Sequence, residues 1–127
     1  MDFDIETFFV KKSIKREYQE RILFELKSKK HREKAISRFA HSANSFLKND
    51  FLNCDFSCFI NQFVQNKNLA TCYIISNGLY DGESLPTQEA IEFCQKSYVT
   101  VILISSKFIA VKEEVEKGSS MIFVLAI

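Results

Sequence analysis

The loop from Ser76 to Ser84 carries the side chains that are best placed to do chemistry in this chain. Its candidate ligand residues are Asn77, Tyr80, Asp81, Glu83 and Ser84, directly before a predicted helix. Only Gly82 separates the carboxylates of Asp81 and Glu83, a spacing that suits a metal ion or a cationic group. Asn-Gly and Asp-Gly are also the commonest turn pairs, so an ordinary turn explains the same residues. The loop lacks the glycine spacing of a phosphate-binding loop.

Cysteine and histidine form a second set of reactive groups. The cysteines are Cys54, Cys58, Cys72 and Cys94. The first two form C-x3-C rather than the C-x2-C of common zinc sites, so we expect reduced thiols, no metal and no cofactor. His31 and His41 lie on one predicted helix, about 15 Å apart, and cannot share a metal ion. His41 could still orient Cys54 or Cys58 as a nucleophile, as in a cysteine hydrolase.

Basic charge is confined to one part of the chain. Residues 11–48 carry twelve Lys or Arg and four Glu, a net charge of +8, whereas residues 1–10 carry −3 and residues 49–127 carry −4. The densest group is a basic patch of Lys27, Lys29, Lys30, His31, Arg32 and Lys34. Such a patch suits an acidic protein or a nucleic acid. We favour the simpler explanation, the solvated face of two helices, and place an acidic protein before a nucleic acid as the partner.

The candidate loop must be positioned by the elements on either side of it. Tyr73–Ile75 and Val99–Ile104 are apolar and rich in β-branched residues, which predicts buried strands. Between them the pattern predicts a helix at about 84–96, with Ser84 as a candidate cap, Pro86 in the first turn and an inner face of Ala90, Ile91 and Cys94. A crossover helix joining two strands makes them parallel, and ligands gather beyond the carboxyl ends of such strands.

The first half of the chain is predicted to be mostly helical. For residues 1–10 we expect a short edge strand or a packed arm. Apolar residues at every third or fourth position predict helices from Ser13 to about Lys27 and from about Lys29 to Leu47, which should form an antiparallel hairpin. A third helix is expected from about Ser57, after a turn at residues 53–55, with Asp55 or Ser57 as its cap.

After Ile104 the sequence permits two interpretations. One is a hairpin of strands at about 99–105 and 108–115, followed by a turn at 116–119 and a last strand at 121–126. The other places a helix at about 109–117 and makes the last strand parallel; we favour the hairpin. Residues 1–127 are thus predicted to be one α+β domain. Its helical hairpin and third helix would pack on a mixed sheet of about four strands with one β-α-β crossover.

Two resemblances can be stated. The segments KKSIKREYQERILFELKSKKHREKAISRFAH and TCYIISNGLYDGESLPTQEAIEF resemble a group of small bacterial cytosolic proteins of unassigned function, which brings no catalytic residues. The segment DGESLPTQEAIEFCQKSYVTVILISSKF is similar to the middle of TIR domains. No tryptophan follows it, basic helices replace the family's first strand, and Glu113 or Glu114 is a loose equivalent of that family's glutamate.

Composition sets the expected setting and function. No apolar run is long enough to span a membrane, and the N-terminus is acidic, so we predict a cytoplasmic protein that does not bind membranes. Because no catalytic motif stands out, we predict a non-catalytic protein-binding module, such as an inhibitor or immunity-type partner. The alternatives are nucleic-acid binding by the basic hairpin, and a small enzyme, TIR-like or hydrolase, that uses the 76–84 loop.

Overall fold

The computed structural model describes residues 1–65, 68–115 and 121–127. Its helices are α1 (Phe3–Ser13), α2 (Arg16–Lys27), α3 (Arg32–Ser37), α4 (Ala43–Phe46), α5 (Phe56–Phe59), the π-helical turn η1 (Ile60–Val64) and α6 (Thr87–Lys96). Its strands are β1 (Leu52–Asp55), β2 (Thr71–Ser76), β3 (Ser84–Pro86), β4 (Val101–Ile104), β5 (Phe108–Lys112) and β6 (Met121–Ala126). The predicted α+β class is confirmed.

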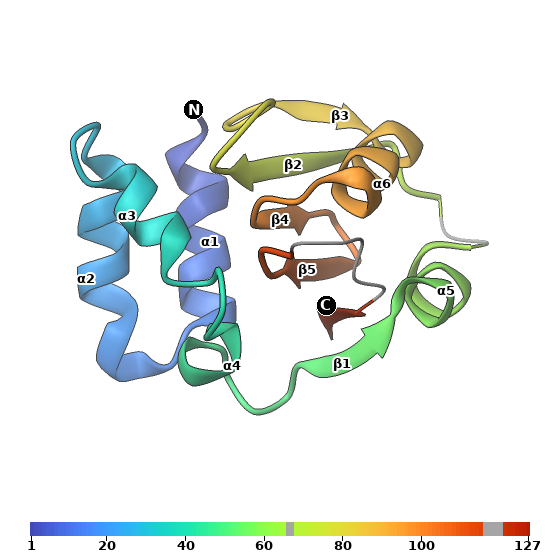
Figure 1. The fold of residues 1–127 in the computed structure, drawn as a ribbon, viewed down its shortest axis with the longest axis horizontal. Helices are drawn as coiled ribbons and strands as arrows, with labels where there is room; N and C mark the ends of the chain where they lie inside the picture. Colours follow the sequence, from blue (N-terminus) through green and yellow to red (C-terminus); the bar gives the residue numbers. More distant parts are fainter. Residues whose placement is uncertain (66–67, 116–120) are drawn as a thin grey trace.

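The six strands form one sheet in the order β1-β6-β5-β4-β2-β3, and every pair is antiparallel. Helices cover both faces, with α1 to α4 on one side and α5 and α6 on the other (Figure 1). Alternate residues of β2 show this arrangement, since Tyr73 and Ile75 belong to the core under α1 to α4, whereas Cys72 and Ile74 belong to the core under α5 and α6. The prediction of a mixed sheet of about four strands is therefore wrong.

The prediction that Tyr73–Ile75 and Val99–Ile104 run parallel is also wrong, because β2 and β4 pair antiparallel, with Tyr73 opposite Ile104. The cause is β3, which turns the chain back along β2 before α6 begins. Since β3 and β4 both oppose β2, they point the same way, and α6 joins β3 to β4 across β2. Ser84 consequently lies in a strand and does not cap the helix, and Pro86 occupies the N-cap position.

The N-terminal half differs from expectation at two places. Residues 1–10 belong largely to helix α1 instead of an edge strand, because the Asp2 carboxylate accepts hydrogen bonds from the N–H groups of Asp4 and Ile5 and caps the helix. The helix predicted at 29–47 is broken into α3 and α4. At the break, Glu113 accepts a hydrogen bond from the Ala43 N–H, and the Glu114 N–H donates to the Ala40 carbonyl. These long-range bonds replace the helical hydrogen bonds lost there.

Of the remaining predictions, some are confirmed and others are wrong. The hairpin after Ile104 is confirmed, since β4 pairs with β5 and β5 with β6, so a helix at 109–117 is wrong. The predicted turn at 116–119 lies outside the described residues. The turn expected at 53–55 is instead strand β1, an edge strand paired with β6. Asp55 caps α5 as predicted, because its carboxylate accepts a hydrogen bond from the Cys58 N–H at 2.7 Å.

Candidate functional site

Arg32, predicted to belong to an exposed basic patch, is buried with 7% of its surface exposed. Its guanidinium donates to both carboxylate oxygens of Glu6, at 2.6 and 2.7 Å, and to both of Asp81, at 2.7 and 2.9 Å. A further bond of 3.0 Å reaches the Leu26 carbonyl. One side chain of α3 thus joins α1, the end of α2 and the turn after β2.

The network continues from Glu6 into the sheet. The Tyr73 hydroxyl, on β2, donates to Glu6 at 2.7 Å and accepts a hydrogen bond from the Asp2 N–H at 3.0 Å. Burial and the hydrogen bond to Glu6 raise the pKa of Tyr73. Burial lowers the pKa of Arg32, but its bonds to Glu6 and Asp81 outweigh that effect and raise it. Both groups keep their protons at neutral pH, so they act as hydrogen-bond donors that hold the elements of the network together.

The predicted ligand loop is the turn of the β2–β3 hairpin. The Gly82 N–H donates to the Ile74 carbonyl, and the Ile74 N–H donates to the Glu83 carbonyl. Asp81 also accepts a hydrogen bond from the Ser76 N–H at 3.1 Å, and Tyr80 adopts a left-handed conformation with φ 66°. Asp81 is therefore engaged by Arg32 and the backbone, so the two carboxylates of the loop do not form a free pair.

The other loop residues have different surroundings. The Asn77 amide donates to the Ser37 hydroxyl at 3.0 Å, which fastens the turn to α3. The Tyr80 ring stands edge-on to Phe93, with ring centroids 5.0 Å apart. Glu83 and Ser84 are exposed. The structure thus links the two predicted site groups directly through the Arg32–Asp81 ion pair.

The four lysines of the basic patch remain outside the network. Lys27, Lys29, Lys30 and Lys34 are exposed, and none of them makes an ion pair with another described residue. His31 is half-buried, bonded to the Ser28 hydroxyl at 2.8 Å and stacked at a tilt beside Phe24. The cations available to a partner are therefore lysines.

Beside these lysines lies a hollow of about 580 Å³, here called the basic groove. It is lined by Met1, Phe3, Leu26, Lys27, Lys29, Arg32, Glu33, Ile36, Ser76, Asn77, Gly78 and Asp81. Met1 and Phe3 are exposed apolar side chains, whereas Leu26 and Ile36 belong to the buried core and reach its wall. The groove combines apolar surface with the ammonium groups of two lysines, and Arg32 and Asp81 hold its sides together.

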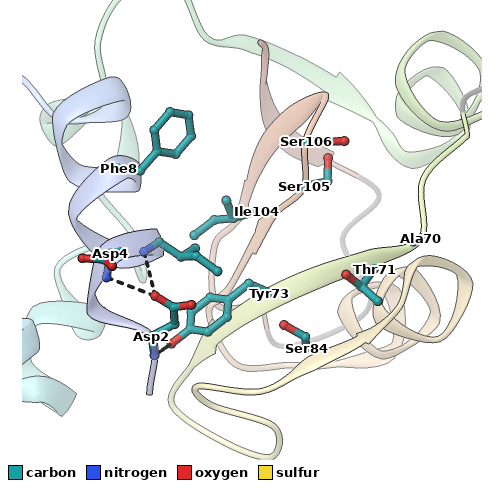
Figure 2. Close-up of a pocket in the computed structure, with 11 residues that line it drawn as sticks. Asp2, Asp4, Phe8, Ala70, Thr71, Tyr73, Ser84, Ile104, Ser105 and Ser106 are labelled. Carbon is teal, nitrogen blue, oxygen red and sulfur yellow. Dashed lines mark hydrogen bonds between the residues drawn. The ribbon is translucent and has the colours of Figure 1, made fainter.

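A second hollow, of about 560 Å³, lies between α1 and the sheet (Figure 2). Asp2, Tyr73 and Ser105 supply polar atoms to it, beside the apolar side chains of Phe8 and Ile104. Its most buried polar groups are already bonded within the protein. Tyr73 bonds to Asp2 and Glu6, and the Ser105 hydroxyl bonds to the backbone of Phe108. This hollow offers a ligand only exposed carboxylates and hydroxyls.

The remaining reactive groups do not assemble into a centre. Cys54 and Cys58 are partly buried and interact with each other, and burial together with that interaction raises the pKa of Cys54 to about 11. His41 is exposed and has no hydrogen bond to either thiol. Within residues 1–65, 68–115 and 121–127, no three His, Cys, Asp or Glu side chains are grouped so that they could hold a metal ion. The Glu113 carboxylate caps α4.

The burial of Arg32 and Glu6 follows from their positions around their helices, and the density of charge along the sequence does not show it. Arg32 precedes Ala35, Ile36 and Phe39 at i+3, i+4 and i+7, which places it on the apolar stripe. Glu6 stands in the same relation to Phe9 and Val10 on α1. That periodicity is the available signal, and it indicates two opposite charges that both face the core.

No family model, curated protein or solved structure matches this chain. Among its described helices, none combines the length and the apolar character needed to cross a bilayer.

Proposed function

We propose that this protein is a non-catalytic binding module whose basic groove takes an acidic segment of a partner protein with at least one apolar side chain. The observation that carries the proposal is the combination at one place of exposed Met1 and Phe3 with unpaired Lys27 and Lys29. An apolar anchor would lie against the first pair, and carboxylates would meet the second.

The Arg32 network supports this role by making the groove rigid before binding. Its bidentate bonds hold α1, α3 and the β2–β3 turn, which are the three sides of the groove. A surface that needs no reordering loses less conformational entropy on association. The network itself has no free donor aimed at a ligand, since Arg32 is saturated by two carboxylates and a carbonyl.

An acidic peptide fits this groove better than nucleic acid does. Nucleic-acid surfaces track a phosphate backbone with many cations or stack bases on exposed aromatic rings. Here the groove has two lysines beside apolar side chains, and its lining also includes the carboxylates of Glu33 and Asp81. An enzyme at the 76–84 loop is disfavoured because Asp81 is occupied by Arg32.

The test is selection of peptides from a random display library on the immobilised protein, followed by affinity measurement on the selected peptides. We expect enrichment of sequences with Asp or Glu flanking an apolar residue. Lys27→Glu with Lys29→Glu should weaken these peptides at least roughly tenfold, since each reversal replaces an attraction by a repulsion. Lys11→Glu with Lys12→Glu, exposed on α1, makes the same change in net charge and should have little effect.

Peptides without acidic enrichment, or equal loss in both double variants, would refute the proposal. Generic duplex and single-stranded oligonucleotides are measured beside the peptides at rising salt. Submicromolar binding to them with a steep salt dependence would favour nucleic acid instead.

A further inference from the structure

A third hollow lies on the other side of the β2–β3 turn from the basic groove, and carboxylates take the place of the lysines in its lining. It measures about 460 Å³ and lies between the turn, β3 and α6. Its apolar lining is Leu79, Tyr80, Leu85 and Phe93, its acidic lining is Glu89 and Glu92, and Lys96 and Ser97 complete it. We call the four apolar and two acidic residues the acidic–aromatic surface.

The apolar part of this surface is open to solvent. Leu79, at the tip of the turn, is 70% exposed and Tyr80 is 38% exposed. Tyr80 keeps its left-handed backbone and its edge-on contact with Phe93, so the ring is held in place on the surface. Such a fixed apolar hollow is suited to an inserted ring or aliphatic chain.

The two carboxylates outnumber Lys96, the one cation that lines the hollow. Glu89 has no ion-pair partner in the described part of the chain, and Glu92 has only Lys96, at 4.0 Å, with both of those side chains largely exposed. A ligand for this surface should therefore carry an apolar group with a cation beside it.

The same chain presents that combination on α2. The Phe24 ring is 64% exposed, which is unusual for an aromatic side chain in a helix that packs on a core. Lys27 follows one turn later on the same helix face, and His31 lies beside the ring with centroids 5.8 Å apart. Lys30 belongs to the turn that carries His31. We call Phe24, Lys27, Lys30 and His31 the Phe24 edge.

We propose that the acidic–aromatic surface binds the Phe24 edge of a second copy of this chain. Phe24 would enter the hollow between Leu79 and Phe93, and Lys27 and Lys30 would meet Glu89 and Glu92. Figure 1 shows α2 and α6 on opposite sides of the molecule, so one copy cannot join its own two surfaces.

A contact between two different surfaces leaves one of each free on every pair, so association continues head to tail beyond the dimer. This inference goes beyond the proposed function, with which it shares only Lys27. An acidic partner segment in the basic groove would compete for that lysine and shorten the assemblies.

The test is sedimentation velocity of the full chain from micromolar to millimolar concentration, with circular dichroism to confirm that each variant is folded. The wild type should show a sedimentation coefficient that rises with concentration beyond that of a dimer. Salt at about 1 M, where the screening length is about 3 Å, should weaken the association roughly tenfold or more. Phe24→Ala should weaken it roughly thirtyfold, and Leu52→Ala, at another exposed apolar side chain, should not.

Charge exchange makes the contact specific. Glu89→Lys with Glu92→Lys should be monomeric, as should Lys27→Glu with Lys30→Glu. A mixture of these two double variants should associate again, because each altered surface then meets its complement. Glu17→Lys with Glu20→Lys, on the exposed side of α2, matches the first variant in net charge and should still associate.

A wild type that stays monomeric at every concentration would overturn the inference. So would a mixture that fails to associate, growth that stops at a dimer, or equal loss in the Glu17/Glu20 variant. The two tests share Lys27, so peptide binding is also measured on the Glu89→Lys with Glu92→Lys variant, which leaves the lining of the basic groove unchanged and should bind peptide like the wild type.

Discussion

Replacing Arg32 by methionine removes the only cation of the buried network and leaves the Glu6 carboxylate, whose side chain is 2% exposed, without its bidentate partner. Breaking a buried ion pair in this way costs about 3–5 kcal/mol of unfolding free energy. Loss of the ion pair with Asp81 adds less to this cost, because the Asp81 side chain is 20% exposed and water can replace the guanidinium. The total free energy of unfolding of a chain of 127 residues is roughly 6–19 kcal/mol. We therefore expect Arg32→Met to remove a large fraction of the stability.

The assay is urea unfolding followed by circular dichroism, with a double-mutant cycle. Adding Glu6→Gln to Arg32→Met removes the stranded charge while keeping an acceptor for Tyr73, so it should restore about 2 kcal/mol. Arg21→Met is the matched control, since Arg21 is 67% exposed and pairs with Glu25 only at 3.7 Å; it should change stability by less than about 0.5 kcal/mol. An Arg32→Met variant as stable as Arg21→Met, or no recovery on adding Glu6→Gln, would refute the reasoning.

Three further predictions concern pH and backbone conformation. Hydrogen bonds from Arg38 outweigh burial and lower the pKa of Glu25 from 4.5, so this pair stabilises the fold above pH 4.5 and its contribution is lost as the pH falls; Arg38→Gln should flatten urea-derived stability between acid and neutral pH. Burial raises the pKa of Cys72 from 9.0 to about 11 and that of Cys94 to about 12. The stability that these thiols contribute below pH 9.0 should therefore be lost as the pH rises through these values. Under reducing conditions, the variant Cys72→Ala with Cys94→Ala should lose less stability over the same pH range than the wild type does. Gly82 has φ +80°, so Gly82→Ala should cost about 1–2 kcal/mol and lower the melting temperature.

Helices and strands whose apolar residues recur at a regular spacing could be predicted from the sequence. Ala90, Ile91 and Cys94 form the buried face of α6 as expected, and α2 ends at Lys27. The strand after Ser105 was also found, because alternation outweighed the helical composition of the residues that follow it. In each case the residues that define the element also supply its packing, so local pattern and tertiary structure agree.

The direction of β2 relative to β4 could not be predicted, because it depends on the three-residue strand Ser84–Pro86. A strand of that length is too short to show an alternation of apolar and polar side chains, and Pro86 at its end is typical of the first turn of a helix. The break between α3 and α4 was hidden for a different reason. Its lost helical bonds are replaced by Glu113 and Glu114, which lie some 70 residues away along the chain. Neither feature is encoded in a local window.

Within the basic half of the chain, the least exposed ion pairs are made by two arginines. Arg32 bonds one acid from residues 1–10 and one from residues 49–127, and Arg38 bonds Glu25 through two nitrogens. Arg32 thereby joins the oppositely charged parts of the sequence in the folded chain, whereas Arg38 joins two residues of the basic part. A guanidinium fork suits such bidentate, buried pairs, whereas an ammonium group is more strongly hydrated and is left at the surface. Within the basic patch, Arg32 is therefore used inside the fold, and the four lysines keep their charge at the surface.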